Sequence, residues 1–377
     1  MIHIRPRWML LKIMTDEGIC GWGEPVVEGR ARTVETAVEE YRPVLIGADP
    51  LRIEHLLQLM YRGTYYRGGP VIMSAISGIE MALWDIKGKY YNAPVYDLIG
   101  GKCRDRVRMY GHLKPAGLAG DFPVPAMLDI ARRRMQEGFT VVKYSVIPPV
   151  KPLDNRLMFN SIIERFAAVR EVVGDSVDIA VDFHGRISPA MSVRLLKELE
   201  PYYPLFVEEP VLPENVDVLV NVARSTTIPI ASGERLISKW GFRELIEKQA
   251  VSVVQPDLCH CGGIFEARKI AAFAEMYYMQ MAPHNPLGPV SLAACLQLDA
   301  CLPNLLAQEH PGMPDHRDLG AGILKKPFTI ENDGCILLPE GPGLGIEVDE
   351  AAISDETFEG NWDTPHLFFE DGSVADW

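Results

Sequence analysis

The chain has 377 residues, 47% hydrophobic and 23% charged, which is the composition of a globular enzyme with two domains or with one large barrel and an appendage. Its formal net charge of −14 leaves no basic surplus to neutralise phosphates, which argues against nucleic acid or an anionic membrane as a partner. A small anionic substrate stays compatible with this charge, because a few local cations and a metal ion suffice to hold it.

Cysteine usage and the first residues predict the compartment. Seven cysteines at irregular spacing are typical of a reduced, cytoplasmic protein. The run Cys259-His260-Cys261 has no second Cys/His pair at zinc spacing, so we expect no zinc site there. The start MIHIRPRWMLLKI has scattered charges and no small-residue cleavage site, and the longest uncharged run, 279–298, is broken by polar residues and prolines. We therefore expect neither a signal peptide nor a membrane span.

Residues 1–105 predict an α+β region. The stretch WMLLKIMTDEGICGWGEP, 8–25, is typical of a β-hairpin that turns at Asp-Glu-Gly. Apolar residues at helical spacing follow in 33–47 and 74–89. We expect a small α+β unit ahead of the main domain.

Between residues 106 and 325, eight short apolar runs alternate with helical patterns. The runs are VRMYGHL, VVKYSVI, VDIAVDFHG, PLFVEEP, IPIASGER, SVVQPDL, YMQMAPHNP and LLAQEH. Such alternation predicts βα units and a parallel sheet. Eight units in this length favour a TIM-type (β/α) barrel over an open doubly wound sheet.

Six of these runs end near an ionisable residue, at intervals of 23 to 27 residues: Asp182, Glu208, Glu234, Asp257, His284 and Glu309. The C-terminal ends of barrel strands surround one mouth, where the catalytic groups of this fold lie. A solvated strand end explains any one of these residues, but not six in register. We therefore expect them to form one site.

Three carboxylates in this set, Asp182, Glu208 and Glu234, come from adjacent runs and predict a metal site. At separations of about 4 Å, two such charges repel by roughly 4 kcal/mol at an effective dielectric constant of about 20. Either protons or a cation must relieve this repulsion, and an all-oxygen set suits Mg²⁺. The alternative is a hydrogen-bonded cluster of protonated carboxyls. Glu209 is expected to point away from Glu208, because strand side chains alternate.

Two histidines are candidates for proton transfer. Asp257 can accept a hydrogen bond from one ring nitrogen of His284, which fixes the tautomer and makes the other nitrogen a general base. A satisfied core histidine is the alternative. His184 follows Asp182 by two residues, so both side chains could reach one ligand.

The motifs DFHGR, VEEP, SGER, QPDLCHCGG, APHNPLGP and AQEH resemble the enolase superfamily of the mandelate racemase and muconate lactonizing type, and within it the sugar-acid dehydratases. The resemblance covers nearly the whole chain, including GWGEPVVEGRART and the terminal SVADW. It implies an N-terminal α+β capping domain at 1–105, a catalytic barrel at 106–325, and a segment at 326–377 that returns to the cap.

The resemblance also implies site roles. One Mg²⁺ would be bound by the three carboxylates, and His284, supported by Asp257, would abstract a proton. His184 would be the general acid, and Glu309 would bind the substrate carboxylate or the developing enediolate. Cap segments 24–30 and 61–69 match loops that select the substrate. Arg62 and Arg67, in the second segment, would face substrate oxygens or simply solvent.

The reaction implied is a hydro-lyase reaction on an aldonic or aldaric acid. An aldonate, with D-galactonate as the first candidate, would lose its C2 proton and C3 hydroxyl to give a 2-keto-3-deoxy acid. Alternatives are dehydration of gluconate, arabinonate or an aldarate, an epimerase or cycloisomerase acting through the same enediolate, and a non-catalytic homologue. A homo-oligomer, from dimer to octamer, is expected by analogy.

One position departs from the racemases of this superfamily. They carry Lys-x-Lys at the end of the second barrel strand, whereas this chain has Lys143-Tyr144-Ser145. Lys143 could neutralise the substrate carboxylate, or it could be a buried lysine satisfied by neighbouring carboxylates. Ser145 cannot abstract a carbon-bound proton unaided, which disfavours racemisation by two bases. The loop at 147–155 is unusually rich in proline and bears on which sugar acid is bound.

Overall fold

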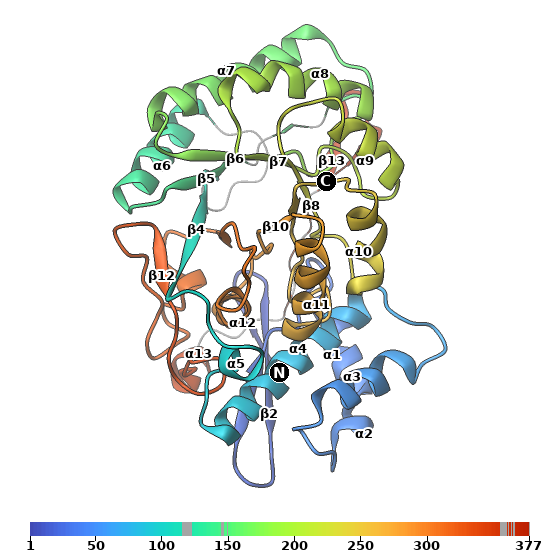
Figure 1. The fold of residues 1–377 in the computed structure, drawn as a ribbon, viewed down its shortest axis with the longest axis vertical. Coiled ribbons are helices and arrows are strands. Elements are labelled where there is room, and N and C mark those ends of the chain that lie inside the picture. The colour runs from blue at the N-terminus through green and yellow to red at the C-terminus, as the bar shows by residue number, and fades with distance from the viewer. Residues whose placement is uncertain are drawn as a thin grey trace.

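The structure, a computed structural model, places an α+β domain beside a barrel of parallel strands wrapped by helices (Figure 1). It describes residues 1–114, 123–144, 147–148, 150–354, 360, 362, 364 and 366–376. In Figure 1 the N-terminal domain lies below the barrel in blue, and the C-terminal elements β12 and α13 lie at its left, in orange and red.

The N-terminal domain combines a three-stranded antiparallel sheet with helices. The strands are β1 (Ile2–Ile4), β2 (Trp8–Met14) and β3 (Cys20–Gly23), with β2 in the centre. The helices are α1 (Ala31–Glu40), α2 (Arg42–Leu45), α3 (Ile53–Arg62), α4 (Pro70–Tyr91) and α5 (Val95–Leu98). A Cβ added to Gly23 would lie 1.9 Å from the carbonyl oxygen of Gly78, so only glycine lets β3 and α4 approach this closely. The predicted hairpin and both helical patterns are confirmed, whereas the sequence did not indicate β1 or α3.

Eight parallel strands form the barrel, one from each of the eight predicted runs. They are β4 (Arg106–His112), β5 (Val141–Tyr144), β6 (Asp178–Asp182), β7 (Phe206–Glu208), β8 (Ile230–Ser232), β9 (Val253–Val254), β10 (Gln280–Met281) and β11 (Gln308–His310). Consecutive strands pair from β4 to β10, and β11 pairs with β4. The amide of Met281 donates to Asn304 and that of Leu306 to Met281, which closes the ring. The predicted (β/α) barrel is confirmed.

Helices cover the outside of the barrel. They are α6 (Val124–Gln136), α7 (Arg156–Val173), α8 (Pro189–Leu199), α9 (Val216–Ala223), α10 (Ser238–Glu247), α11 (Ile264–Glu275) and α12 (Pro289–Asp299), with short 3-10 turns η1 (Glu200–Tyr202) and η2 (Arg317–Leu319). In α8, Met191, Leu195 and Leu199 recur at a spacing of four residues and are buried. None of the helices among the described residues is long and apolar enough to cross a bilayer.

An apolar ring fills the barrel interior. Each strand, or the residues next to it, contributes one buried side chain: Tyr110, Val141, Ala180, Phe206, Ala231, Val253, Ala282 and Ala307. Because side chains of a strand alternate between its two faces, the next inward position lies two residues further on, toward the C-terminal mouth. This ring therefore lies directly below the layer of side chains that face the mouth.

The C-terminal segment contacts both the barrel and the N-terminal domain. β12 (Cys335–Leu337) pairs antiparallel with β4, and α13 (Glu350–Ser354) follows. The amide of Leu344 donates to Asp85 of α4 at 2.9 Å. A last hairpin joins β13 (Leu367–Phe368) to β14 (Val374–Ala375). The described residues of the 326–377 segment therefore pack against the rest of the protein and have no hydrophobic core of their own.

Candidate active site

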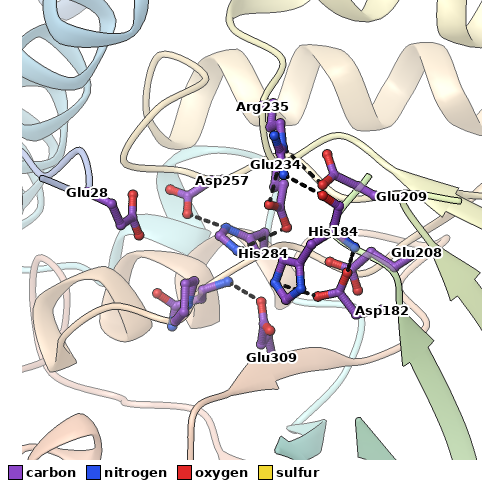
Figure 2. A network of polar contacts seen from close by, with 12 residues as sticks. Glu28, Asp182, His184, Glu208, Glu209, Glu234, Arg235, Asp257, His284 and Glu309 are labelled. Atoms are coloured by element: carbon purple, nitrogen blue, oxygen red, sulfur yellow. Dashed lines mark hydrogen bonds and ion pairs between the residues drawn. The ribbon is translucent and has the colours of Figure 1, made fainter. Parts of the chain in front are cut away.

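Polar side chains stand directly above the apolar ring. Two residues beyond a ring member on the same strand or its extension come His112, Lys143, Asp182, Glu208, His284 and Glu309, and four residues beyond Val253 comes Asp257. Strand alternation therefore directs these groups to the interior of the mouth. They are buried or nearly so, and Figure 2 shows most of them converging from different strands.

Glu234 reaches the same mouth by a different route. It follows the ring member Ala231 by three residues, which would place it outside on a regular strand. Gly233 has a φ of 148°, a left-handed conformation that reverses the alternation. A Cβ at Gly233 would lie 2.9 Å from the backbone of Gln255, so a larger residue would not fit. The glycine of the SGER motif thus turns Glu234 inward.

Asp182, Glu208 and Glu234 form the one group of His, Cys, Asp or Glu side chains, in the part of the chain that the structure describes, whose ligand atoms could share a metal ion. One oxygen from each lies within 4.8 Å of the others. Asp182 and Glu208 are paired in the parallel register of β6 and β7. One buried oxygen of each of the three has only ion-pair contacts among the described residues: Asp182 Oδ2 with Lys143 and His184, Glu208 Oε2 with Lys143, and Glu234 Oε2 with His284. A hard divalent cation suits such an oxygen set.

Lys143 supplies a positive charge to this cluster. Its Nζ lies 2.8 Å from Glu208, 3.0 Å from Glu309 and 3.2 Å from Asp182. Burial lowers the pKa of Lys143, but these three carboxylates outweigh it and hold the pKa well above its ordinary value. Lys143 is therefore charged and is bound by carboxylates, as one of the two sequence interpretations had it.

The pKa values of the two carboxyls that face each other across β6 and β7 shift in opposite directions. Burial and the neighbouring Asp182 raise the pKa of Glu208 well above its ordinary value. Burial also raises the pKa of Asp182, but His184 and Lys143 outweigh it and lower the value to about 2. A divalent cation among these carboxyls would favour their ionised forms and so oppose the rise in the pKa of Glu208.

His284 is held against Asp257. Its Nδ1 lies 2.7 Å from Asp257 Oδ2, and the two residues form a parallel bridge beyond β9 and β10. The other oxygen of Asp257 accepts from the amide of Cys259 at 2.7 Å. The other ring nitrogen of His284, Nε2, lies 3.3 Å from Glu234 Oε2. Burial lowers the pKa of His284, but Glu234, Glu309 and the bond to Asp257 raise it well above its ordinary value.

His184 lies beside Asp182, but not through regular strand geometry. β6 ends at Asp182, and His184 has a left-handed backbone with φ 50°. Its amide donates to Asp182 Oδ1 at 2.8 Å, and its Nε2 lies 3.0 Å from Oδ2. Burial lowers the pKa of His184 to about 4, although Asp182 opposes the shift. The two side chains converge because the chain turns back after the strand.

Glu309, on β11, contacts three groups at the mouth of the barrel. Its Oε1 lies 2.6 Å from His112 Nε2 and 3.0 Å from Lys143 Nζ, and its Oε2 accepts from the amide of Asn285 at 2.7 Å. Burial raises the pKa of Glu309, but Lys143, His284 and His112 outweigh it and hold the pKa well below its ordinary value. An ionised Glu309 thus fixes Lys143 and the residue after His284.

The expected substrate arginines lie apart from this cluster. Arg62 and Arg67 are exposed and make no hydrogen bond or ion pair with the rest of the described residues. Their loop approaches the barrel at Gly68, where an added Cβ would lie 3.7 Å from Ile237. Ser145 and part of the loop at 147–155 fall outside the described residues.

Several residues of the site were not indicated by the sequence. Glu209 was expected to point away, but its φ of 41° ends the strand, and its carboxylate accepts from Arg235 Nε at 3.0 Å within the same network (Figure 2). His112 follows the alternation of β4, a signal that the run VRMYGHL carries. Glu28 and His260 join through a contact of 3.3 Å between the N-terminal domain and the barrel, for which the sequence holds no local signal.

Known proteins match both parts of the chain. Residues 4–100 match the mandelate racemase / muconate lactonizing enzyme N-terminal domain, and residues 126–352 match the enolase C-terminal domain-like family. A protein of Ralstonia pickettii (strain 12J) named D-galactonate dehydratase is 46% identical over 381 residues, covering 100% of this chain and 98% of its own. One of the same name from Variovorax paradoxus (strain S110) is 47% identical over 381 residues with the same coverage.

Solved structures of proteins with related names share the fold of this chain. A mandelate racemase/muconate lactonizing enzyme from Sulfitobacter sp superposes with a TM-score of 0.86 at 34% identity, covering 95% of this chain and 93% of that one. One from Jannaschia sp. CCS1 has a TM-score of 0.85 at 33% identity, covering 96% of each chain. The resemblance drawn from the motifs is confirmed: the chain belongs to the mandelate racemase/muconate lactonizing enzyme family of the enolase superfamily.

Proposed function

We propose that this protein is a magnesium-dependent dehydratase of a sugar acid, with D-galactonate as its first candidate substrate. The observation that carries the proposal is the convergence of three carboxylates, a His–Asp pair and a second histidine at one mouth of the barrel. The reaction class is supported by membership of the family, and the substrate by two full-length relatives named D-galactonate dehydratase.

Asp182, Glu208 and Glu234 would hold the metal ion. Their all-oxygen character favours Mg²⁺ over softer metals. When bound, the ion supplies positive charge that stabilises the negative charge developing on the substrate carboxylate as its neighbouring carbon loses a proton, and that offsets the carboxylates raising the pKa of His284.

His284 would be the general base. Asp257 accepts from Nδ1 at 2.7 Å, which leaves Nε2 to take a proton. Nε2 faces the carboxylate cluster, since Glu234 lies 3.3 Å from it. A sugar acid bound through its carboxylate at the cluster would therefore present C2 to this nitrogen.

His184 would be the general acid, from the other side of the cluster. The electron pair of the broken C2–H bond forms the C2–C3 double bond, and the C3–O bond breaks as the hydroxyl takes a proton and leaves as water. The resulting enol becomes the 2-keto-3-deoxy acid. Because burial lowers the pKa of His184 to about 4, the acid role requires the bound anionic substrate to raise that pKa.

Lys143 on β5 and Glu309 on β11 would complete the substrate site. Lys143 is bound by three carboxylates, so it serves as fixed positive charge rather than as a second base. This supports dehydration over racemisation. Arg62 and Arg67 stay proposed substrate contacts, which they could make only if their loop moved toward the mouth on binding. A homo-oligomer and a cytoplasmic location also stay predictions.

The test is turnover of an aldonic and aldaric acid panel with Mg²⁺: D-galactonate, D-gluconate, D-arabinonate and galactarate. We expect 2-keto-3-deoxy product, detected as its semicarbazone and by NMR, with the highest kcat/KM on D-galactonate. Activity should be lost in EDTA and restored by Mg²⁺. Formation of an isomer without loss of water would favour an epimerase or cycloisomerase instead. If no acid reacts and none exchanges its C2 proton in D₂O, the proposal is wrong.

A further inference from the structure

A chain of polar contacts runs from the N-terminal domain to the side chain of His284. Glu28, in the segment after β3, places Oε2 3.3 Å from Nε2 of His260. The same nitrogen lies 3.6 Å from Asp257 Oδ2, and that oxygen lies 2.7 Å from His284 Nδ1. Figure 2 shows Glu28 on the Asp257 side of His284. The mechanism above uses only the last two members of this chain.

His260 is fixed from both domains. Its Nδ1 lies 3.3 Å from the hydroxyl of Ser74 in α4, while its Nε2 lies between Glu28 and Asp257. His260 is 7% exposed, and Asp257 and Ser74 are fully buried. A buried histidine between two carboxylates is stable when it carries a charge. In keeping with this, Asp257 and Glu28 outweigh burial and raise the pKa of His260 to about 9.

Asp257 is held by two hydrogen bonds and one ion-pair contact. Its Oδ1 accepts from the amide of Cys259 at 2.7 Å, its Oδ2 accepts from Nδ1 of His284 at 2.7 Å, and the ring of His260 lies 3.6 Å from the same Oδ2. A charged His260 attracts Oδ2, so its position bears on the orientation of the carboxylate and of the His284 ring. A general base that is misplaced by about 1 Å can lose about 100-fold in rate.

The same cap segment also holds the chain on the other side of His284. Glu24 accepts from the amides of Gly288 at 2.7 Å and Ser291 at 2.9 Å, at the start of α12. Gly288 has no side chain to cap the helix, and a Cβ there would lie 2.6 Å from Glu24. Segment 24–28 thus contacts His260, which lies beside Asp257, and also the start of α12, the helix that follows His284.

We propose that Glu28 and His260 are positioning residues for the Asp257–His284 pair, so that the seating of cap segment 24–28 on the barrel sets the orientation of the general base. The proposal rests on the proposed function for its kinetic part, and on contacts of the described residues for its structural part. It assigns His260 of the Cys259-His260-Cys261 run a part in the site.

The first experiment compares Glu28→Gln and His260→Gln with the parent and with Glu54→Gln. The control removes another carboxylate of the N-terminal domain, which pairs with Lys269 of α11 at 3.0 Å but does not reach Asp257. With Mg²⁺ and D-galactonate, or another panel acid that the parent turns over, we expect kcat to fall by about 10- to 100-fold in both variants with KM changed by less than about threefold. C2 proton exchange in D₂O should fall in parallel, and the double variant should be no slower than the slower single variant.

The second experiment needs no turnover. In protein labelled with ¹⁵N-histidine, the hydrogen-bonded Nδ1 proton of His284 is assigned by its loss in His284→Asn. Its resonance should shift in Glu28→Gln and in His260→Gln but not in Glu54→Gln. An unmoved resonance in both variants would overturn the positioning role, as would full kcat in both. If the two variants shift the resonance but the parent dehydrates no sugar acid, the positioning contacts are supported and the proposed function is wrong.

Discussion

Asp182 and Glu208 stand opposite each other in the parallel register of β6 and β7, and the ammonium of Lys143 lies within 3.2 Å of a carboxylate oxygen of each. Two of the three proposed metal ligands thus lie against one buried cation. Because the charge of Lys143 and that of a bound metal would relieve the same repulsion, their effects on stability should be linked.

Replacing Lys143 with Met tests this link. Without divalent ions, the variant should unfold more easily, by about 3–5 kcal/mol, because buried carboxylates lose their counter-charge. Added Mg²⁺ should then raise the Tm of the variant by more than it raises that of the parent. Thermal unfolding in EDTA and in Mg²⁺ measures both, with Lys12→Met, which removes an exposed ion pair to Glu350, as the control. Equal Tm increases in the variant and the parent would contradict the link.

Glu234→Gln tests the metal ligand that a glycine turns into the mouth. The variant loses one of three anionic ligands, so its Mg²⁺ affinity should fall by about 10- to 100-fold. Its Tm without metal should change little. Calorimetric titration with Mg²⁺ measures the affinity. Glu209→Gln is the matched control, since Glu209 is buried nearby but its hydrogen bond is to Arg235. A variant that binds Mg²⁺ as the parent does would remove Glu234 from the ligand set.

His284→Asn and His184→Asn separate the base from the acid. Loss of the base in His284→Asn should lower the rates of both dehydration and C2 proton exchange by about 10²–10⁴-fold. Loss of the acid should reduce dehydration by a similar factor while some exchange survives, because the C2 proton still reaches His284. Both rates are followed by NMR in D₂O with D-galactonate, and the exposed His55→Asn serves as the control. Parent-like dehydration in both variants would show that the two roles are misassigned.

The barrel and most of its mouth were predictable because both follow from periodic rules. A spacing of one βα unit identifies equivalent strand ends without knowing their local conformation, and strand alternation then decides which side chains face inward. Asp182 and Glu208 obey both rules. Glu234 obeys the spacing but not the alternation, and only the φ of Gly233 explains how it enters.

What the sequence could not predict depends on how the two domains dock. Glu28 and His260 are far apart in the chain, and Glu24 accepts from Gly288 across 264 positions, so neither pair has a local pattern. The prediction for Glu209 was wrong for a local reason. The alternation rule assumes an extended backbone, and the backbone is no longer extended at Glu209, where φ is 41°. Contacts made by docking or by a single backbone turn need coordinates.

His310 offers a pH test of stability outside the mouth. It follows Glu309 on β11, is 1% exposed, and lies 3.5 Å from Asp318. Burial lowers its pKa from 6.5 to about 4 and outweighs Asp318. Between these two values the unfolded chain binds more protons than the folded one, so the free energy of unfolding falls as pH falls from 6.5 to 4, by roughly 3 kcal/mol for this group. Urea unfolding from pH 7.5 to 4 should show a smaller loss in His310→Gln than in the parent or in the exposed-site control His55→Gln. Identical losses in all three proteins would mean that His310 takes up its proton equally in the folded and unfolded chains.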